Sequence, residues 1–297
     1  MMEQNLPGFL DSDFLRKLEN LHLVAKRLSW PSAKGEHPAS RKGFSLEFSD
    51  YRRYHAGDDL RYVDWNVYRR LGKPFLKVFT AEEDLNIYLL LDASASMAEG
   101  KNPKTQYAKS VAAALGYIGL KNLDRVGCMG FSAEMMPRLP LGRGRKQILA
   151  LFSFLEKLSC RGETDLRGAA KSFSLSFPRQ GLVILLSDLF DPTGYRDGLE
   201  ELIRKKYDLL VIHIVDEAEI RLTPQGDADM VDVESLREKP VFLDSHLTRR
   251  FNEEMARYLE EAESFCLNRG VEYLRTTTAT PFEDFVLVYL RRGLTVK

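Results

Sequence analysis

The sequence predicts an α/β protein with a three-layer, doubly wound, mostly parallel sheet, preceded by an N-terminal helix and a β-rich extension. From residue 85 onward, short apolar runs alternate with longer segments whose apolar residues recur at helical spacing. This alternation is typical of parallel strands joined by crossover helices. The run at 85–91 is apolar apart from Asn86, and the strand at 181–187 is apolar from Leu182 to Leu186, as expected of strands buried on both faces. With 297 residues, of which 44% are hydrophobic, the chain can build a full core.

Hydrophobic periodicity assigns the individual elements in chain order. An amphipathic helix is expected at 12–28, because its leucines recur every three residues from Leu15. Strands are expected at 85–91, 126–131, 181–187, 208–215 and 271–276. Helices are expected at 104–120, 145–158, 165–177, 195–206 and 247–268. A last helix begins at Thr280, where the sequence TPFE combines a capping box with a proline at the first helical position.

Composition divides the chain into three regions. Residues 1–40 hold the N-terminal helix and a linker rich in Pro, Gly and Ser, residues 41–83 form an extension dense in Arg and Asp, and residues 84–293 form the α/β domain. An insertion at 217–246 interrupts this domain. Residues 216–234 carry seven acidic side chains and one basic side chain. The stretches EIRL, MVDV and PVFL of the insertion are expected to be β-like.

Charge and cysteine content argue against several classes of protein. Lys and Arg (43) balance Asp and Glu (43), so no net field attracts nucleic acid or a membrane surface. No apolar run approaches the ~20 residues of a membrane span, and the first residues lack the basic-then-apolar plan of a signal peptide. Three scattered cysteines without a CxxC pair suit free thiols in a reducing compartment. We therefore expect a cytoplasmic protein without membrane insertion.

Oxygen-bearing side chains stand where predicted strands end. Asp92, Ser94 and Ser96 follow the first strand of the domain, Thr164 precedes a helix, and Asp188 follows the strand at 181–187. Ligands of doubly wound sheets bind at the carboxyl ends of central strands, so we expect these residues to form one site at the surface. Hydroxyl and carboxylate oxygens are hard ligands that suit Mg²⁺ or Mn²⁺. As an alternative, the DASAS sequence could simply cap a helix that follows a strand.

This pattern resembles the metal-ion-dependent adhesion site of von Willebrand factor A-type domains. In that family the motif D-x-S-x-S follows the first strand, a Thr precedes a helix, and an Asp follows the fourth strand. The resemblance implies that Ser94, Ser96 and Thr164 bind the metal through their hydroxyls, whereas Asp92 and Asp188 act largely through water. It also implies that an acidic side chain of a partner fills the open position, and that the fold is von Willebrand A-like.

The extension carries a second signature, which comprises Tyr51-Arg52-Arg53-Tyr54, Gly57-Asp58-Asp59, Arg61, Asp64-Trp65 and Arg69, followed by Lys77. It resembles the R-x-Y-x-x-G-D-D-x-R-x-x-D-W signature of the bacterial domain of unknown function 58 family, whose members pair it with a downstream von Willebrand A-type domain. The resemblance covers about residues 40–290. Members are often encoded beside MoxR-type AAA+ ATPases, so the resemblance implies such an ATPase as a partner.

The charged side chains of the extension allow two interpretations. In one, the arginines form a phosphate-binding stripe with Tyr and Trp for stacking. In the other, they pair with the neighbouring acids in a salt-bridge network that docks the extension on the sheet. The interleaved charges favour the network, because a nucleic-acid face would not usually hold four acids in its footprint. The residues concerned are Arg52, Arg53, Arg61, Arg69, Arg70, Asp50, Asp58, Asp59 and Asp64.

The two resemblances imply a non-enzymatic, metal-dependent protein-interaction module. They also imply that it works with a MoxR-type AAA+ ATPase, or with a client that presents an acidic side chain, in the assembly or maturation of other proteins. No catalytic residue, organic cofactor or nucleic-acid partner is expected. One alternative is a Mg²⁺-dependent phosphoryl-transfer enzyme with Asp92 as nucleophile or metal ligand, although the sequence places no clear Lys or Arg at a strand end to clamp a phosphate. The other alternative is a nucleic-acid-binding module that uses residues 41–80.

Overall fold

The chain divides into two compact units. The computed structural model describes residues 12–28, 46–55, 57–81, 85–99, 103–134, 137–223, 226–232 and 237–292. The larger unit is formed by Met1–Ala33 and Leu85–Lys297, and the smaller unit by Lys34–Asp84. Within the described ranges, none of the helices combines the length and apolar character that a membrane crossing requires.

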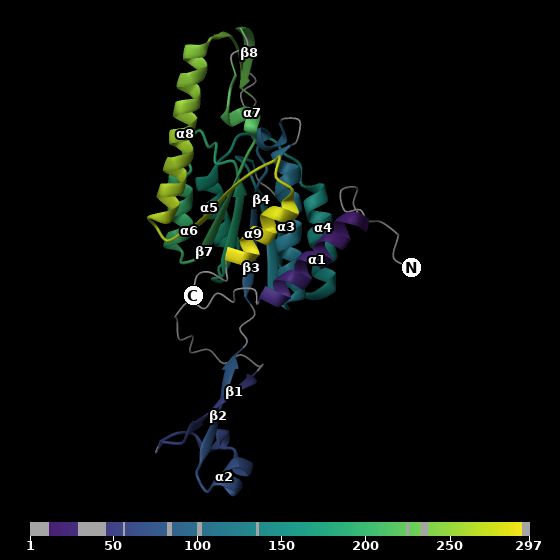
Figure 1. Cartoon of the computed structure of the whole chain (residues 1–297), viewed down its shortest axis with the longest axis vertical. Helices are drawn as coiled ribbons and strands as arrows, with labels where there is room; N and C mark the ends of the chain where they lie inside the picture. Colours follow the sequence, from purple (N-terminus) through teal and green to yellow (C-terminus); the bar gives the residue numbers. More distant parts are fainter. Residues whose placement is uncertain are drawn as a thin grey trace. The chain divides into compact units, whose positions relative to one another are not determined.

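A six-stranded sheet forms the centre of the larger unit (Figure 1). In spatial order its strands are β10 (Glu272–Thr277), β7 (Asp208–Val215), β6 (Leu182–Ser187), β3 (Asn86–Asp92), β4 (Arg125–Phe131) and β5 (Arg138–Gly142). The first five are parallel, and β5 pairs antiparallel with β4 at the edge. The strand order reverses at β3, which lies between β4 and β6. Such a reversal creates a ligand-binding crevice at the carboxyl ends of the strands.

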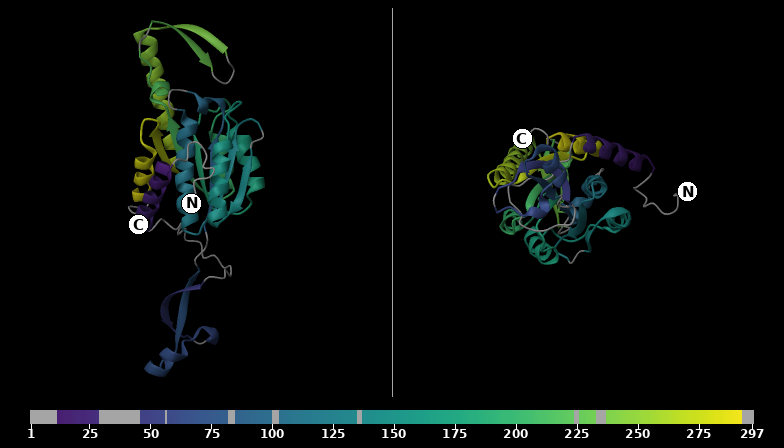
Figure 2. Two further views of the ribbon diagram at one scale, coloured as in Figure 1. Left: turned by 90° about the vertical axis from the view of Figure 1, so that its right-hand side faces the viewer. Right: turned by 90° about the horizontal axis from the view of Figure 1, so that it is seen from below.

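Helices cover both faces of the sheet, which confirms the predicted three-layer α/β architecture (Figures 1 and 2). On one face lie α1 (Ser12–Leu28), α3 (Lys104–Lys121), α4 (Gly144–Lys157) and α9 (Phe282–Arg292). On the other face lie α5 (Leu166–Ser176), α6 (Arg196–Arg204) and α8 (Ser245–Leu267). Alternate residues of β3 enter the two cores, with Leu89 and Leu91 in one and Tyr88 and Leu90 in the other. This is why residues 87–91 of β3 are all apolar.

The N-terminal helix belongs to the larger unit. Leu18 and Leu21 of α1 are buried in the same core as α3 and α9. Lys17 Nζ lies 2.7 Å from Glu283 Oε1 of α9, and the rings of Phe14 and Phe282 are 5.1 Å apart. The predicted linker that follows this helix lies outside the described residues.

The insertion contains a helix that the sequence does not predict. The stretch EIRL was expected to be β-like, and this is wrong, because α7 (Glu217–Ile220) forms there. Asp216 precedes α7 and accepts a hydrogen bond from the Ala218 N–H at 2.8 Å, which stabilises the first turn. The other two stretches fall largely on β8 (Gly226–Asp232) and β9 (Arg237–Leu243), an antiparallel hairpin that precedes α8 (Figure 2).

The smaller unit is a hairpin with two short helices. Its strands β1 (Leu46–Arg53) and β2 (Phe75–Ala81) are antiparallel. The 3₁₀-helix η1 (Leu60–Tyr62) and α2 (Trp65–Leu71) lie between the strands in sequence. Asp64 begins α2 by accepting hydrogen bonds from the N–H groups of Asn66 and Val67. Gly72, in the left-handed conformation with φ 64°, ends it.

Candidate functional site

Asp92 is the last residue of the central strand and is 1% exposed. Beyond it the chain stays on the sheet edge, because the Ala93 N–H donates to the carbonyl of Phe131 at 2.8 Å. The chain then turns, and the Ser94 N–H donates to Asp92 Oδ1 at 3.0 Å. This turn leads into the 3₁₀-helix η2 (Ala95–Ala98). The carboxylate of Asp92 is thereby fixed at the end of β3.

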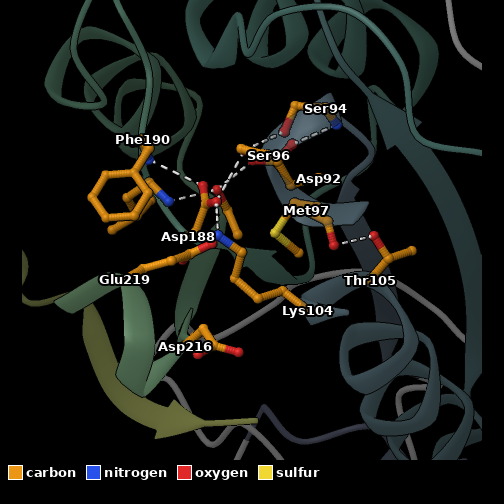
Figure 3. A network of polar contacts seen from close by, with 12 residues as sticks. Asp92, Ser94, Ser96, Met97, Lys104, Thr105, Asp188, Phe190, Asp216 and Glu219 are labelled. Carbon is orange, nitrogen blue, oxygen red and sulfur yellow. Dashed lines mark hydrogen bonds and ion pairs between the residues drawn. The ribbon is translucent and has the colours of Figure 1, made fainter. Parts of the chain in front are cut away.

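Two serine hydroxyls connect this turn to the end of β6 (Figure 3). The Oγ atoms of Ser94 and Ser96 are 3.0 Å apart, and Ser96 Oγ donates to Asp188 Oδ2 at 3.0 Å. Ser94 precedes η2 but makes no side-chain capping bond. The two hydroxyls therefore do not act as the helix cap that DASAS could have formed, and they contact each other and Asp188 instead.

The loop that carries Thr164 lies against the same turn. The Ala95 N–H donates to the carbonyl of Gly162 at 2.9 Å, and the Arg161 N–H donates to the carbonyl of Ala93 at 2.8 Å. Thr164 itself is buried and stands just before α5. The three predicted segments thus meet at one edge of the sheet.

The predicted location of the site at the surface is wrong for most of these residues. Asp92, Ser94 and Asp188 are at most 1% exposed, and only Ser96 is half-buried. The reason is the backbone pairing between the loop at 161–164 and the turn at 93–95, together with a lysine that the sequence does not place here.

Lys104, the first residue of α3, is a member of the site that sequence reasoning missed. Its Nζ donates to Asp188 Oδ2 at 2.8 Å and to Glu219 Oε2 of α7 at 2.5 Å (Figure 3). The residue is 0% exposed. The sequence places no clear Lys or Arg at a strand end to clamp a phosphate, and Lys104 does not stand at one. Instead, the start of α3 brings its ammonium group to the end of β6.

Burial raises the pKa of two carboxyl groups at this edge, Asp92 and Glu219. Burial, followed by the nearby charge of Asp188, raises the pKa of Asp92 to about 7, although the hydroxyl of Ser187 donates to Asp92 Oδ2 at 2.5 Å. Burial alone would lower the pKa of Lys104, but the charges of Asp188 and Glu219 outweigh it and raise this pKa. Lys104 is therefore an ammonium ion at neutral pH.

His213 of β7 contacts the backbone of Asp188 and is uncharged. Burial lowers its pKa to about 4, so the ring is neutral at pH 7. Its Nε2 lies 2.8 Å from the backbone carbonyl of Asp188, which can only accept, so Nε2 carries the proton. Nδ1 then accepts from the hydroxyl of Tyr273 at 2.7 Å. The ring fixes the backbone at Asp188.

The donor set fits a small divalent cation by its chemistry. Two carboxylates and three hydroxyls supply only oxygen atoms, which suits Mg²⁺ or Mn²⁺. Lys104 pairs with two of the acidic side chains at this edge, Asp188 and Glu219, and among the described residues no ion pair joins it to Asp92. No group of three or more His, Cys, Asp or Glu side chains suited to a metal occurs among the described residues, so hydroxyls are needed to complete such a site.

In the smaller unit the salt-bridge network forms in part. Arg52 makes two hydrogen bonds with Asp58, at 2.7 and 2.8 Å, and Arg61 pairs with Asp59. Asp64 instead contacts Lys77 Nζ at 3.2 Å and accepts from the hydroxyl of Tyr51 at 2.9 Å. Within the described part of the chain, the other arginines of α2 and β1 form no ion pair. The predicted docking of this segment on the sheet stays a prediction.

Comparison with solved structures finds chains with the same kind of architecture. The structure is similar to the hypothetical protein BatB from Bacteroides thetaiotaomicron, with 16% sequence identity and a TM-score of 0.45, over 71% of this chain and 99% of that chain. It is also similar to the SpRpn10 VWA domain, with 12% identity and a TM-score of 0.42, over 72% of this chain and 100% of that one.

Comparison of sequences gives a relative and a family. The chain is 26% identical over 230 residues to the uncharacterized protein Rv1480 of Mycobacterium tuberculosis (strain ATCC 25618 / H37Rv), which covers 76% of this chain and 72% of that protein. The family model described as "Protein of unknown function DUF58" matches residues 50–261, a span that includes the smaller unit from residue 50 onward and all five predicted site residues. The chain therefore belongs to the DUF58 family.

Proposed function

We propose that this chain is a non-enzymatic, cytoplasmic protein-interaction module that binds an acidic side chain of its partner through Mg²⁺ or Mn²⁺. The residues that would hold the ion are Asp92, Ser94, Ser96, Thr164 and Asp188. One observation carries the proposal: Ser94 contacts Ser96, and Ser96 donates to Asp188, at the edge where the strand order reverses. The backbone of the loop before Thr164 pairs with the same turn.

The choice of donors explains why a partner would be required. Ser94, Ser96 and Thr164 are neutral, and Lys104 already offsets part of the charge of Asp188. A divalent ion held in this way keeps a positive charge and accepts an outside carboxylate. Ser96 is the half-buried member of the set and gives the direction from which that carboxylate would come.

A MoxR-type AAA+ ATPase is the proposed partner because members of this family are often encoded beside such ATPases. The chain carries the Gly57-to-Trp65 signature and belongs to the DUF58 family. We propose that the chain works with such an ATPase in the assembly or maturation of other proteins, and that the metal site receives either the ATPase or a client.

Thermal unfolding with and without Mn²⁺ tests the metal site. An ion that binds only the folded protein, at about 100 times its Kd, stabilises it by ~2.7 kcal/mol, which corresponds to roughly 5 °C or more for a domain of this size. We expect Asp92→Asn, which keeps the shape of the buried side chain, to remove this shift, as Asp92→Ala should. The control is Asp197→Ala, which removes a carboxylate that lies in an exposed ion pair with Arg167 and belongs to no predicted donor set. An equal Mn²⁺ response in wild type and Asp92→Asn at millimolar metal contradicts the proposal.

Lys104 favours phosphoryl transfer as a second candidate function. An ammonium ion beside Asp92 and Asp188 is a combination that phosphoryl-transfer sites use. However, Lys104 is fully buried, and its Nζ already donates to two carboxylates. Few of its N–H donors are therefore accessible to a phosphate. A turnover screen with generic phosphate esters and Mg²⁺ distinguishes the two functions. Hydrolysis by wild type that is abolished in Asp92→Asn would show that the chain is a phosphoryl-transfer enzyme.

A further inference from the structure

We infer that Lys104 is a built-in counter-cation that competes with a divalent ion for Asp188, with Glu219 as the second carboxylate that keeps the ammonium paired when the ion binds. This inference rests on the proposed metal site and deepens it. It assigns the site a regulatory residue that lies outside the predicted donor set.

The competition follows from a shared atom. Asp188 Oδ2 accepts from Ser96 Oγ at 3.0 Å and from Lys104 Nζ at 2.8 Å. A divalent ion bound by Ser96 and Asp188 would therefore lie close to the ammonium group. Two like charges at such a distance, away from bulk water, repel strongly. Either the ion binds more weakly than the donor set alone would allow, or the ammonium withdraws from Asp188.

Glu219 gives the ammonium a place to withdraw to. Its Oε2 lies 2.5 Å from Lys104 Nζ, so the ion pair on that side persists when the contact with Asp188 is lost. The ring of Phe190, 5.5 Å from the ammonium, adds a favourable contact. Glu219 is on α7, the first element of the insertion. Binding of a metal ion would therefore change the ion pair that joins Lys104 to the start of the insertion.

Isothermal titration with Mn²⁺ measures the competition directly. We expect Lys104→Met to tighten Mn²⁺ binding by about tenfold or more, since the repelling charge is gone. In EDTA the same variant should melt at a lower temperature than wild type, because its buried carboxylates lose their cation. The matched control is Lys109→Met on the same helix: Lys109 is also buried, but its Nζ donates to the carbonyl of Leu158 and touches no carboxylate. Lys109→Met should leave the Mn²⁺ affinity unchanged.

A second variant keeps the inference testable if Lys104→Met does not fold. The double variant Lys104→Met/Glu219→Gln removes one positive and one negative charge and should also bind Mn²⁺ more tightly than wild type. Glu219→Gln alone should weaken Mn²⁺ binding, because the ammonium then has only Asp188 as a carboxylate partner. An affinity for Mn²⁺ that is the same in wild type and in a folded Lys104 variant overturns the inference.

The proposed metal site and the role of Lys104 fail in different ways. If Asp92→Asn abolishes Mn²⁺ binding but the Lys104 variants bind as wild type does, the metal site stands and the competition is overturned. If wild type does not bind Mn²⁺ and the Lys104 variants do, the competition is supported, and the native protein uses lysine in place of the metal. If no variant binds Mn²⁺, both are overturned.

Discussion

Each oxygen of the buried Asp92 carboxylate has its own hydrogen-bond donor. Oδ1 accepts from the Ser94 N–H and Oδ2 from the Ser187 hydroxyl. Ser187 Oγ in turn accepts from the Leu189 N–H at 2.9 Å. Leu189 has φ 59°, which is unfavourable for a residue with a branched side chain, and burial of that side chain offsets the strain. Ser187 therefore stabilises both the carboxylate and the strained turn after β6.

Ser187→Ala should lower the free energy of unfolding by about 1–3 kcal/mol, because it leaves a buried carboxylate oxygen and a backbone N–H without their partner. Urea unfolding in EDTA measures this loss without any contribution from metal. Ser110→Ala is the control, since the Ser110 hydroxyl bonds only to a carbonyl of its own helix, and its effect should stay within about 0.5 kcal/mol. Equal losses in the two variants would show that the Ser187 hydroxyl has no special role.

The sequence allows the strand-end residues of the site to be predicted but not Lys104. Asp92 and Asp188 directly follow apolar runs, and parallel strands bring their carboxyl ends to one edge, so the proximity of these residues follows from topology. Lys104 instead begins a helix, and its contact depends on where α3 starts relative to β6. The acidic partner Glu219 lies in a stretch expected to be β-like. No local pattern encodes either contact.

The buried strands are predicted well because they are apolar on both faces, whereas the edge strand β5 is missed. Its sequence RLPLG contains Pro140 and is at most half-buried. Proline and alternating exposure give no clear strand signal, and only pairing with β4 makes this segment a strand. Similarly, η1 and α2 are too short for a helical period, although Asp64 and Gly72 mark the ends of α2 once the helix is known.

The packing of α6 against α5 depends on a glycine. A Cβ atom at Gly198 would lie 2.8 Å from the backbone carbonyl carbon of Leu166 and 2.9 Å from its oxygen. Gly198→Ala should therefore lower the free energy of unfolding by about 1–3 kcal/mol through overpacking, even though alanine has the higher helix propensity. Chemical denaturation measures the change. Asp197→Ala, one residue away in an exposed ion pair, is the control and should change stability by less than about 1 kcal/mol. If Gly198→Ala were more stable than wild type, α5 and α6 would be able to move apart without a loss of stability.

Asp64 holds the smaller unit together. Burial alone would raise its pKa, but hydrogen bonds from Tyr51, the Val67 N–H and other donors outweigh burial and lower the pKa to about 2. A carboxyl whose pKa is lower in the folded state than its unfolded value of about 3.9 stabilises the fold above that value. This stabilisation is lost as the pH falls from about 4 toward 2.

Asp64→Ala should therefore unfold the α2 end of the hairpin at neutral pH, and acid should do the same to wild type. The amide signals of Asn66 and Val67, which donate to Asp64, report this in heteronuclear NMR spectra. Arg61→Ala is the control: the Arg61 side chain is 83% exposed, so its pair with Asp59 adds little. A hairpin that keeps both amide signals unchanged in Asp64→Ala would refute this role.

The two units differ in the chemistry that they offer to a partner. The larger unit has an oxygen-rich, largely buried site at its sheet edge, of which Ser96 is the half-buried member. The smaller unit exposes large apolar side chains on and beside α2, with Trp65 57% exposed and Leu71 62% exposed. Exposed aromatic residues next to arginines are typical of protein-interaction surfaces. A partner could therefore bind through either unit, and the two modes differ in their need for metal.

Capture of a purified MoxR-type AAA+ ATPase on the immobilised full chain separates these modes. If the metal site receives the partner, Ser94→Ala and Thr164→Ala should weaken capture as much as EDTA does, because each removes a hydroxyl ligand while the carboxylates remain. Trp65→Ala should leave the metal-dependent part of the capture unchanged. If capture survives EDTA and both hydroxyl substitutions but falls in Trp65→Ala, the partner binds the exposed face of α2. The proposal that the metal site receives the ATPase would then be refuted, because the donors of that site would play no part in binding it.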